Sequence, residues 1–346
     1  MNHKLLFSTF VPKTQINESK LNKKAKIFIN YFFGPLFFLL FAGSLYRQIS
    51  NQPEFFNKWA QISSEWNNWK FCIAIILVFV NWLIESLKWQ LLVKQLHFFS
   101  FGEAVKSVLS GCAVTLLTPN RVGEFGGRIL YVKSAHRLKA ISLSLVGSFS
   151  QLMITMLMGC VGLFVLNYFL PFHNSTLNFL PVVLKDIMFF LSVLLALIFV
   201  LFYFRLSWIV GIIERLPFLH NVVKHIRILN EFSSQFLFKI LFLSFVRYIV
   251  FILQYVLLLQ VMHVELAGWF CFCLLTVFYM VIAIIPSLGI VELPIRLTAA
   301  WIIFKMYSTN ELGIGAASLC IWIINVVVPA MIGSLLMLNL KIIKEK

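Results

Sequence analysis

Acidic residues are scarce in this chain, which has one aspartate, Asp186, and twelve glutamates among 346 residues. Enzymes that act on glycosidic or phosphate bonds commonly use paired or clustered carboxylates, so this scarcity disfavours such activities. The seven histidines are scattered and form neither a His-Glu-x-x-His nor a His-x3-His pattern, so we expect no metal site and no cofactor. All six cysteines fall in apolar runs, where they indicate small buried side chains rather than disulfides.

Apolar residues are abundant: 60% of the chain is hydrophobic and the mean hydropathy is +0.91. Only 12% of the residues are charged, against about 25% in an ordinary soluble domain. The composition therefore predicts an all-α polytopic membrane protein. The net charge of +16 does not indicate nucleic-acid binding, because the basic residues form short clusters between apolar runs, where they suit anionic lipid. The first 26 residues are polar and basic, and we expect no cleavable signal peptide.

The apolar runs predict about six full spans and two broken, re-entrant helical hairpins. The predicted spans are 27–47, 70–93, 140–169, 182–204, 238–262 and 313–338, and the hairpins are 102–128 and 266–307. For 266–307, two ordinary short spans are the alternative. We expect a basic N-terminus (1–26), a single membrane domain (27–340) with halves at about 27–169 and 182–338, and a basic tail (341–346).

The distribution of lysine and arginine orients the predicted spans. Segments 1–26, 94–106, 128–139, 205–239 and 341–346 hold 20 of these residues, whereas 48–69, 170–181 and 263–267 hold only Lys58. Because basic loops lie on the cytoplasmic side, both termini are predicted to be cytoplasmic, in a bacterial-type inner membrane. With this orientation, the two hairpins enter from opposite faces.

The stretch Thr118–Arg128 interrupts the first predicted hairpin with residues that a continuous membrane helix would not contain. Pro119 removes a backbone donor and Gly123 permits close approach, so both are expected to break the helix. Glu124 and Arg128 are spaced i, i+4 and can pair on one helical face. Charges in a membrane segment are costly and usually functional. A polar loop at the membrane surface is the alternative to a re-entrant segment that lines a polar cavity.

The second hairpin contains a similar interruption. Pro286, Gly289, Glu292 and Arg296 correspond to Pro119, Gly123, Glu124 and Arg128, with the same spacing of four between glutamate and arginine. This match predicts two inverted-topology halves whose broken helices meet inside the bilayer, as in many transporters. Chance similarity is the alternative.

A phosphate-bearing headgroup that crosses a low-dielectric layer needs a fixed cationic partner, and a guanidinium binds phosphate in a bidentate manner. Arg121 is the preferred headgroup contact, because no intra-motif partner is evident for it. Lys88 and Arg247 lie inside apolar runs; Lys88 either pairs with Glu85 or snorkels to the surface, and Arg247 either contacts substrate or pairs with a glutamate of another helix. The predicted headgroup-binding set is Asn120, Arg121, Glu124, Arg128, Glu292, Arg296, Lys88 and Arg247. The alternative for Glu124–Arg128 and Glu292–Arg296 is a purely structural ion pair.

With these residues in view, the chain resembles the flippase-like membrane domain of lysylphosphatidylglycerol synthetases over roughly residues 25–340. Thr118–Arg128 is similar to the family's Thr-Pro-Gly-Arg-x-Gly-Glu…Arg pattern, and Lys88-Trp89 resembles its basic-Trp pair. The later Pro-Ser…Gly-Val-Arg-Glu pattern is matched less well, since Pro294 and Leu297 replace its glycine and final glutamate. The resemblance implies translocation of an anionic or aminoacylated phospholipid or a lipid-linked sugar. It does not imply lysyl transfer, because we expect no synthetase domain after Lys346.

The sequence therefore predicts a lipid translocase, rather than an enzyme, with membrane phospholipids as partners and a homodimer left open. Two alternatives remain: an enzyme acting on a lipid-linked substrate with Glu124 or Glu292 as base, and a non-transporting membrane scaffold.

Overall fold

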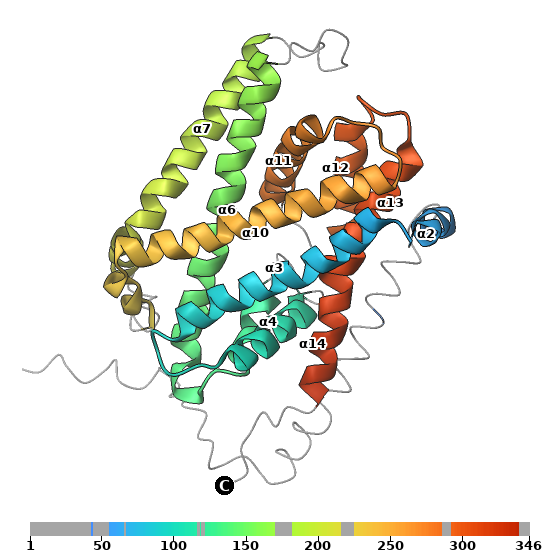
Figure 1. The fold of residues 1–346 in the computed structure, drawn as a ribbon. Coiled ribbons are helices and arrows are strands. Elements are labelled where there is room, and N and C mark those ends of the chain that lie inside the picture. The colour runs from blue at the N-terminus through green and yellow to red at the C-terminus, as the bar shows by residue number, and fades with distance from the viewer. Residues whose placement is uncertain are drawn as a thin grey trace, which may run out of the picture.

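The computed structural model describes residues 43, 55–65, 67–115, 118, 122–169, 182–215, 225–285 and 292–338, and every regular element within them is helical (Figure 1). The predicted first span, 27–47, lies outside the described residues apart from Gly43, as do the basic segments 1–26 and 341–346. This part of the chain forms an all-helical fold, as the composition predicts.

Four helical segments are long and apolar enough to cross a bilayer: Trp69–Val93, Ser134–Tyr168, Ser234–Val261 and Glu311–Leu338. They correspond to α3 (Trp69–Val93), η3–α6–η4 (Ser134–His136, Arg137–Phe164, Val165–Phe169), α10 (Ser234–Val261) and α13–η9–α14 (Glu311–Trp322, Ile323–Val327, Val328–Leu338). Each coincides with a predicted span. A fifth arises if α7 (Val182–Phe204) and α8 (Leu206–Glu214), which are bent by 84°, form one span.

The long helices α3 and α10 lie side by side and form the centre of the bundle (Figure 1). On one side of this pair, α4 (Phe101–Thr115) packs against both α5 (Gly123–Ile129) and α14. On the other side, α11 (Gly268–Ile284) packs against α6 and α12 (Glu292–Phe304), and α12 packs against α13. Thus α6 packs against α11, and α14 packs against α4. The short elements α2 (Phe55–Ser64) and η7 (Arg227–Glu231) complete the described fold.

Both predicted interruptions are present as breaks between helices. At the first interruption α4 ends at Thr115 and α5 begins at Gly123, and at the second α11 ends at Ile284 and α12 begins at Glu292. The backbone N–H of Gly123 donates to Thr118 Oγ1 at 2.7 Å, and a Cβ at this position would collide with Thr118 and with the Val114 backbone. Gly123 is therefore required for close approach at the start of α5. Pro119, Pro286 and Gly289 lie outside the described residues.

Glycines allow two helices to approach the backbone of α4. A Cβ on Gly127 of α5 would overlap the Ser110 carbonyl and lie 2.7 Å from Gly111 Cα. A Cβ on Gly333 of α14 would overlap the Leu109 carbonyl. Small residues at such contacts are typical of helices that associate within membranes, where close backbone packing replaces the hydrophobic effect.

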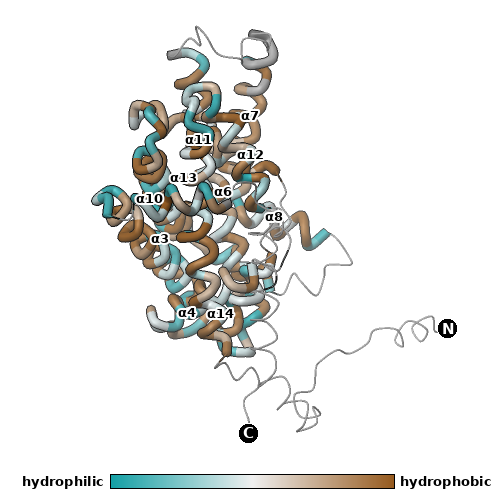
Figure 2. The backbone as a smooth tube through the Cα atoms, turned by 90° about the vertical axis from the view of Figure 1, so that its right-hand side faces the viewer, coloured by the Kyte–Doolittle hydropathy of each residue, from teal (hydrophilic) through white to brown (hydrophobic). Residues whose placement is uncertain are grey.

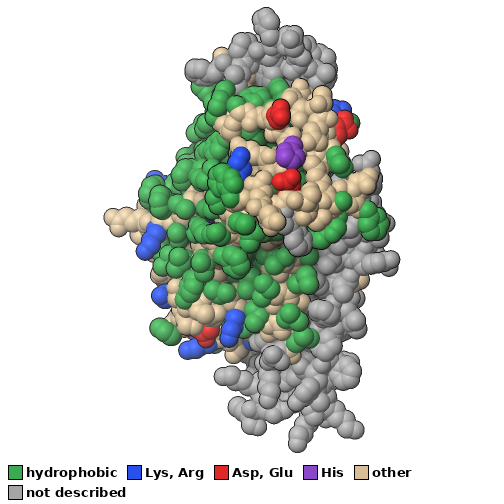
Figure 3. Space-filling view, turned by 45° about the vertical axis from the view of Figure 1, so that its right-hand side comes forward, with side chains coloured by type: hydrophobic (Ala, Val, Ile, Leu, Met, Phe, Trp, Pro, Cys, Tyr) green, Lys and Arg blue, Asp and Glu red, His purple; other side chains and the backbone are tan. Residues whose placement is uncertain are grey.

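The outer surface is strongly apolar, as expected for a protein that lies in lipid. Figure 2 shows apolar residues along the lengths of the helices, and Figure 3 shows a broad hydrophobic area with most of the visible Lys and Arg side chains along its lower and left-hand margins. Phe79, Phe190 and Leu191 are among many large apolar side chains that are more than half exposed. A soluble monomer rarely exposes contiguous apolar area of this extent.

Candidate functional site

A cluster of buried charges lies where α3, α5 and α10 meet, and Glu85 is at its centre. The Glu85 carboxylate contacts three cations: Lys88 Nζ at 2.8 Å, Arg128 Nη2 at 2.6 Å and Arg247 Nη1 at 3.1 Å. The side chains of Lys88 and Arg128 are 1% and 2% exposed. Burial of charge is costly unless the charges are paired, and the shared Glu85 carboxylate pairs with cations on three helices at once.

Each of the two most buried cations has further partners. Arg128 also pairs with Glu124, as the i, i+4 spacing predicts, and its guanidinium lies over the Trp89 ring with 5.4 Å to the centroid. Lys88 Nζ also lies within hydrogen-bond distance of the Gly147 carbonyl (3.2 Å) and Ser244 Oγ (3.4 Å). Of the two alternatives for Lys88, pairing with Glu85 is therefore the observed one, and the lysine does not snorkel to the surface.

A chain of side-chain amides continues from the cluster. Arg247 Nε donates to Asn81 Oδ1 at 2.8 Å, Asn81 Nδ2 donates to Asn325 Oδ1 at 3.0 Å, and Asn325 Nδ2 donates to Gln254 Oε1 at 2.8 Å. Gln254 Nε2 ends the chain on the Ala74 carbonyl at 2.9 Å. Asn325 lies in the π-helical segment η9, which interrupts the regular helix between α13 and α14. Such π-helical turns are frequent at functional sites.

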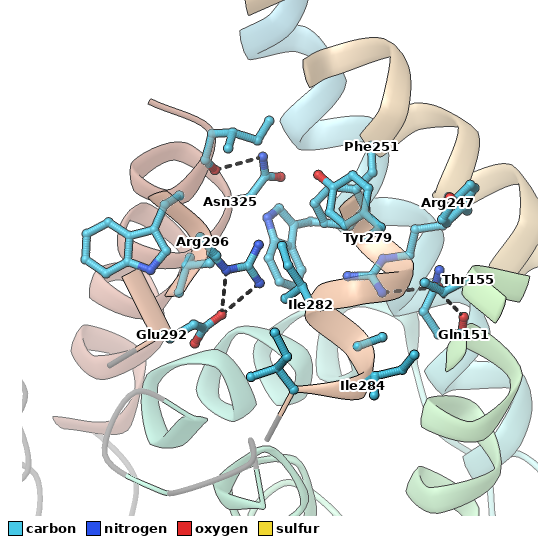
Figure 4. A pocket seen from close by; sticks show the side chains of 17 residues that line it. Gln151, Thr155, Arg247, Phe251, Tyr279, Ile282, Ile284, Glu292, Arg296 and Asn325 are labelled. Carbon is cyan, nitrogen blue, oxygen red and sulfur yellow. Dashed lines mark hydrogen bonds and ion pairs between the residues drawn. The ribbon is translucent and has the colours of Figure 1, made fainter. Parts of the chain in front are cut away.

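A cavity of about 460 Å³ adjoins this network and is lined by residues of α3, α6, α10, α11, α12 and the α13–η9 helix. Arg247 and Arg296 lie on different walls, and Figure 4 shows both guanidinium groups pointing into the space between them. Arg247 lies over the Trp82 and Phe251 rings, with 5.6 and 5.2 Å to their centroids. This volume is within the range of about 300–1,000 Å³ that is typical of small-molecule sites.

The second predicted ion pair is at the edge of the same cavity. Glu292 Oε1 accepts from Arg296 Nη2 at 2.8 Å and from Arg296 Nε at 3.1 Å, and both residues line the cavity (Figure 4). They are the first and fifth residues of α12, one helical turn apart. The pair thus orients the guanidinium of Arg296 at the start of the helix that follows the second break.

The predicted site residues divide into two connected groups. Glu124, Arg128 and Lys88 belong to the buried cluster, Glu292 and Arg296 line the cavity, and Arg247 belongs to both. Asn120 and Arg121, the preferred headgroup contact, lie outside the described residues. The sequence did not identify Glu85 as the shared partner of three cations, or Asn81 and Asn325 as links to Arg247. Their only sequence signal is that they are polar residues in apolar runs, which is weak but typical of functional residues in membranes.

The two groups together carry a small excess of positive charge. Four cations (Lys88, Arg128, Arg247 and Arg296) are opposed by three carboxylates (Glu85, Glu124 and Glu292), which leaves one formal positive charge. Within the described residues, no group of three or more His, Cys, Asp or Glu side chains is arranged to hold a metal ion. The arrangement therefore suits an anion, recognised by guanidinium groups.

These features define a helical membrane protein with a partly open cavity in its bundle, into which two arginines and a glutamate project. The family model of the lysylphosphatidylglycerol synthase TM region matches residues 32–333, so the chain belongs to this family. No curated protein and no solved structure matches the chain.

Proposed function

We propose that the protein is a lipid translocase that moves an anionic or modified phospholipid, or a lipid-linked headgroup, between the leaflets of the inner membrane. The observation that carries the proposal is the pair of arginines, Arg247 and Arg296, that face one cavity within an apolar bundle. An ionised phosphate is strongly disfavoured in a low-dielectric layer unless fixed charges and donors replace its water. Guanidinium groups are the side chains best suited to do so, because their planar fork matches two phosphate oxygens.

In this proposal the headgroup phosphate binds between Arg247 and Arg296 while the acyl chains remain in the surrounding lipid. Glu85 holds Arg247 and Glu292 holds Arg296 when no headgroup is present, so neither guanidinium is left as an isolated charge. Glu85 also pairs with Lys88 and Arg128. These two cations compete with Arg247 for the Glu85 carboxylate, so a phosphate can replace Glu85 as the partner of Arg247. Direct contact of Lys88, Arg128, Asn120 or Arg121 with the headgroup stays a prediction.

The proposed architecture consists of six spans and two re-entrant hairpins in inverted halves, with both termini in the cytoplasm. Four features support it. The helices α3 and α10 pair at the centre, each half has one interrupted helical pair, and each of these pairs packs on the last long helix of the other half. The last long helix of each half also contains a π-helical segment, η4 or η9. Inverted repeats with broken helices at the midplane provide alternating access in many transporters.

The enzyme alternative is less well supported by the geometry. Its proposed bases, Glu124 and Glu292, each pair with an arginine one turn away, which engages the carboxylate that would have to accept a proton. The scaffold alternative gives no reason for two arginines to face a cavity.

Reconstitution into liposomes tests the proposal. Vesicles that contain an acyl-chain-fluorescent phosphatidylglycerol are treated with dithionite, which quenches only outer-leaflet lipid. The wild-type protein should raise the quenched fraction above that of protein-free vesicles, and Arg247→Gln and Arg296→Gln should each reduce this gain. Arg227→Gln is the matched control, because Arg227 is 65% exposed and pairs with Glu214 on the surface.

Two results would contradict the proposal. One is a quenched fraction equal to that of empty vesicles with monodisperse wild-type protein. The other is equal activity of Arg296→Gln, Arg247→Gln and the surface control. Chemically altered lipid with an unchanged leaflet distribution would instead support the enzyme alternative.

A further inference from the structure

Two cations share one oxygen atom of the Glu85 carboxylate. Lys88 Nζ lies 2.8 Å from Glu85 Oε2 and Arg247 Nη1 lies 3.1 Å from the same atom, whereas Arg128 contacts Oε1. Arg247 also lines the cavity, so Oε2 is the atom through which the cavity and the buried lysine are connected. When Arg247 turns towards an anion in the cavity, Oε2 is left to Lys88 alone.

The buried cluster holds more positive than negative charge. Its three cations are opposed by two carboxylates, which leaves one formal positive charge. The groups come from α3, α5 and α10 and are Lys88, Arg128, Arg247, Glu85 and Glu124. Excess charge is costly at a buried site. The guanidinium groups stay protonated, and protonation of a carboxylate would increase the excess. The lysine is therefore the group of this cluster that can remove the excess, by loss of its proton.

The hydrogen bonds of Lys88 suit both a charged and a neutral amine. Ser244 Oγ lies 3.4 Å from Lys88 Nζ and 2.7 Å from Ser150 Oγ, and the Ser150 hydroxyl donates to the Gly147 carbonyl at 2.7 Å. A hydroxyl accepts from an ammonium group and donates to a neutral amine, so rotation of the Ser244 hydroxyl satisfies either form of the lysine. Because the Lys88 side chain is 1% exposed, it depends on these groups rather than on bulk solvent.

From this arrangement we infer that Lys88 is a proton-binding site linked to the anion-binding site at Arg247. An anion in the cavity offsets the excess positive charge and draws Arg247 away from Oε2. Both effects stabilise the ammonium form of Lys88, so a proton passes from solution to Nζ as the anion binds. By linkage, the proton on Lys88 strengthens anion binding by the same free energy. The inference rests on the proposed function and makes movement of an anionic headgroup proton-linked.

Isothermal titration calorimetry tests whether anion binding takes up protons. Dihexanoyl phosphatidylglycerol, a water-soluble monoanion, is titrated into the purified protein in detergent, in buffers of different ionisation enthalpy. The slope of the observed enthalpy against the buffer ionisation enthalpy gives the number of protons taken up. The wild type should take up a proton fraction of up to about one per bound lipid. Its affinity should fall as the pH rises from about 7 to about 10, by at most about tenfold per pH unit.

Lys88→Arg separates the proton site from the positive charge. The variant keeps a cation beside Glu85, but a guanidinium does not lose its proton, so proton uptake and the pH dependence of the affinity should both disappear. Lys88→Met has no titratable group at this position and should show the same loss, which covers the case in which the larger guanidinium does not fit. Lys94→Arg is the matched control, because Lys94 is exposed at the end of the same helix. It should keep the wild-type proton uptake.

The possible outcomes separate this inference from the proposed function. Lipid binding by the wild type without proton uptake would overturn the linkage and leave the translocase intact. Uptake that persists in Lys88→Arg and Lys88→Met would also overturn it, because another group would then bind the proton. If the wild-type protein binds no lipid and moves none in the dithionite experiment, the proposed function fails and the inference fails with it.

Discussion

Replacement of Glu85 by glutamine should be among the most destabilising single changes in the described part of the chain. Glu85→Gln keeps the shape of the side chain but removes the only negative charge that Lys88, Arg128 and Arg247 share. Arg128 would retain Glu124 and Arg247 would retain Oδ1 of Asn81, whereas Lys88 would be left with a backbone carbonyl and a hydroxyl. Removal of one partner from a buried ion pair costs about 3–5 kcal/mol, and we expect a loss of this size.

A double-mutant cycle with Lys88 tests the electrostatic origin of this loss. Lys88→Met keeps most of the side-chain volume and removes one of the cations that Glu85 balances. The double variant Glu85→Gln/Lys88→Met has the same formal charge in the cluster as the wild type, so it should be more stable than Glu85→Gln alone. We expect a coupling free energy of about 0.5–3 kcal/mol, measured by equilibrium unfolding in mixed micelles.

The matched control is Glu214→Gln, which breaks the exposed pair with Arg227 and should change the free energy of unfolding by less than about 1 kcal/mol. The reasoning would be refuted if Glu85→Gln were as stable as this control. It would also be refuted if the two cluster substitutions were simply additive, because Glu85 and Lys88 would then not interact.

Three further predictions concern the packing and the surface of the bundle. Asn325→Leu should lower the free energy of unfolding by about 1–3 kcal/mol, because it leaves two buried amide partners unpaired; equilibrium unfolding measures this. Gly127→Ala should cost about 1–3 kcal/mol through overlap with the backbone of α4. In Gly126→Ala the added Cβ has no neighbouring atom within 4 Å, so this control should be neutral or stabilising. Equal losses of unfolding free energy for the two substitutions would contradict the packing described. At the surface, hydrogen bonds from Asn68 and His263 hold the pKa of Glu65 below its ordinary value. These hydrogen bonds therefore stabilise the folded protein at pH values above the unfolded-state pKa of Glu65, and the stabilisation is lost as the pH falls through the folded-state pKa. The melting temperatures of the wild type and Glu65→Gln should therefore converge on acidification.

The long helices and their interruptions could be predicted because local sequence determines them. Apolar runs of sufficient length identified α3, α6, α10 and the helix that ends at Leu338, and the breaks before Gly123 and Glu292 followed from proline, glycine and charge in those runs. The two i, i+4 ion pairs followed from helical periodicity alone. Of the six expected spans, the one at 27–47 lies outside the described residues apart from Gly43; among the described segments, four are long and apolar enough to cross a bilayer, or five if α7 and α8 form one span.

The centre of the site could not be predicted, because its contacts join distant parts of the chain. Glu85 meets Arg128 and Arg247 only when α3, α5 and α10 pack together, and helical periodicity does not specify which buried charges of different helices meet. The role of Asn325 depends on a π-helical turn, for which the surrounding residues give no clear signal. Polar residues in apolar runs could be recognised as unusual, but their partners required the tertiary structure.

Photo-crosslinking with a phosphatidylglycerol analogue that carries a diazirine beside its phosphate tests the central claim most directly. If headgroups pass between Arg247 and Arg296, mass spectrometry of the labelled protein in vesicles should locate crosslinks on cavity-lining residues of α10 and α12, and unlabelled phosphatidylglycerol should compete for them. Crosslinks confined to lipid-exposed faces, such as the outer surface of α7, would show that the headgroup does not enter the cavity and would contradict the account.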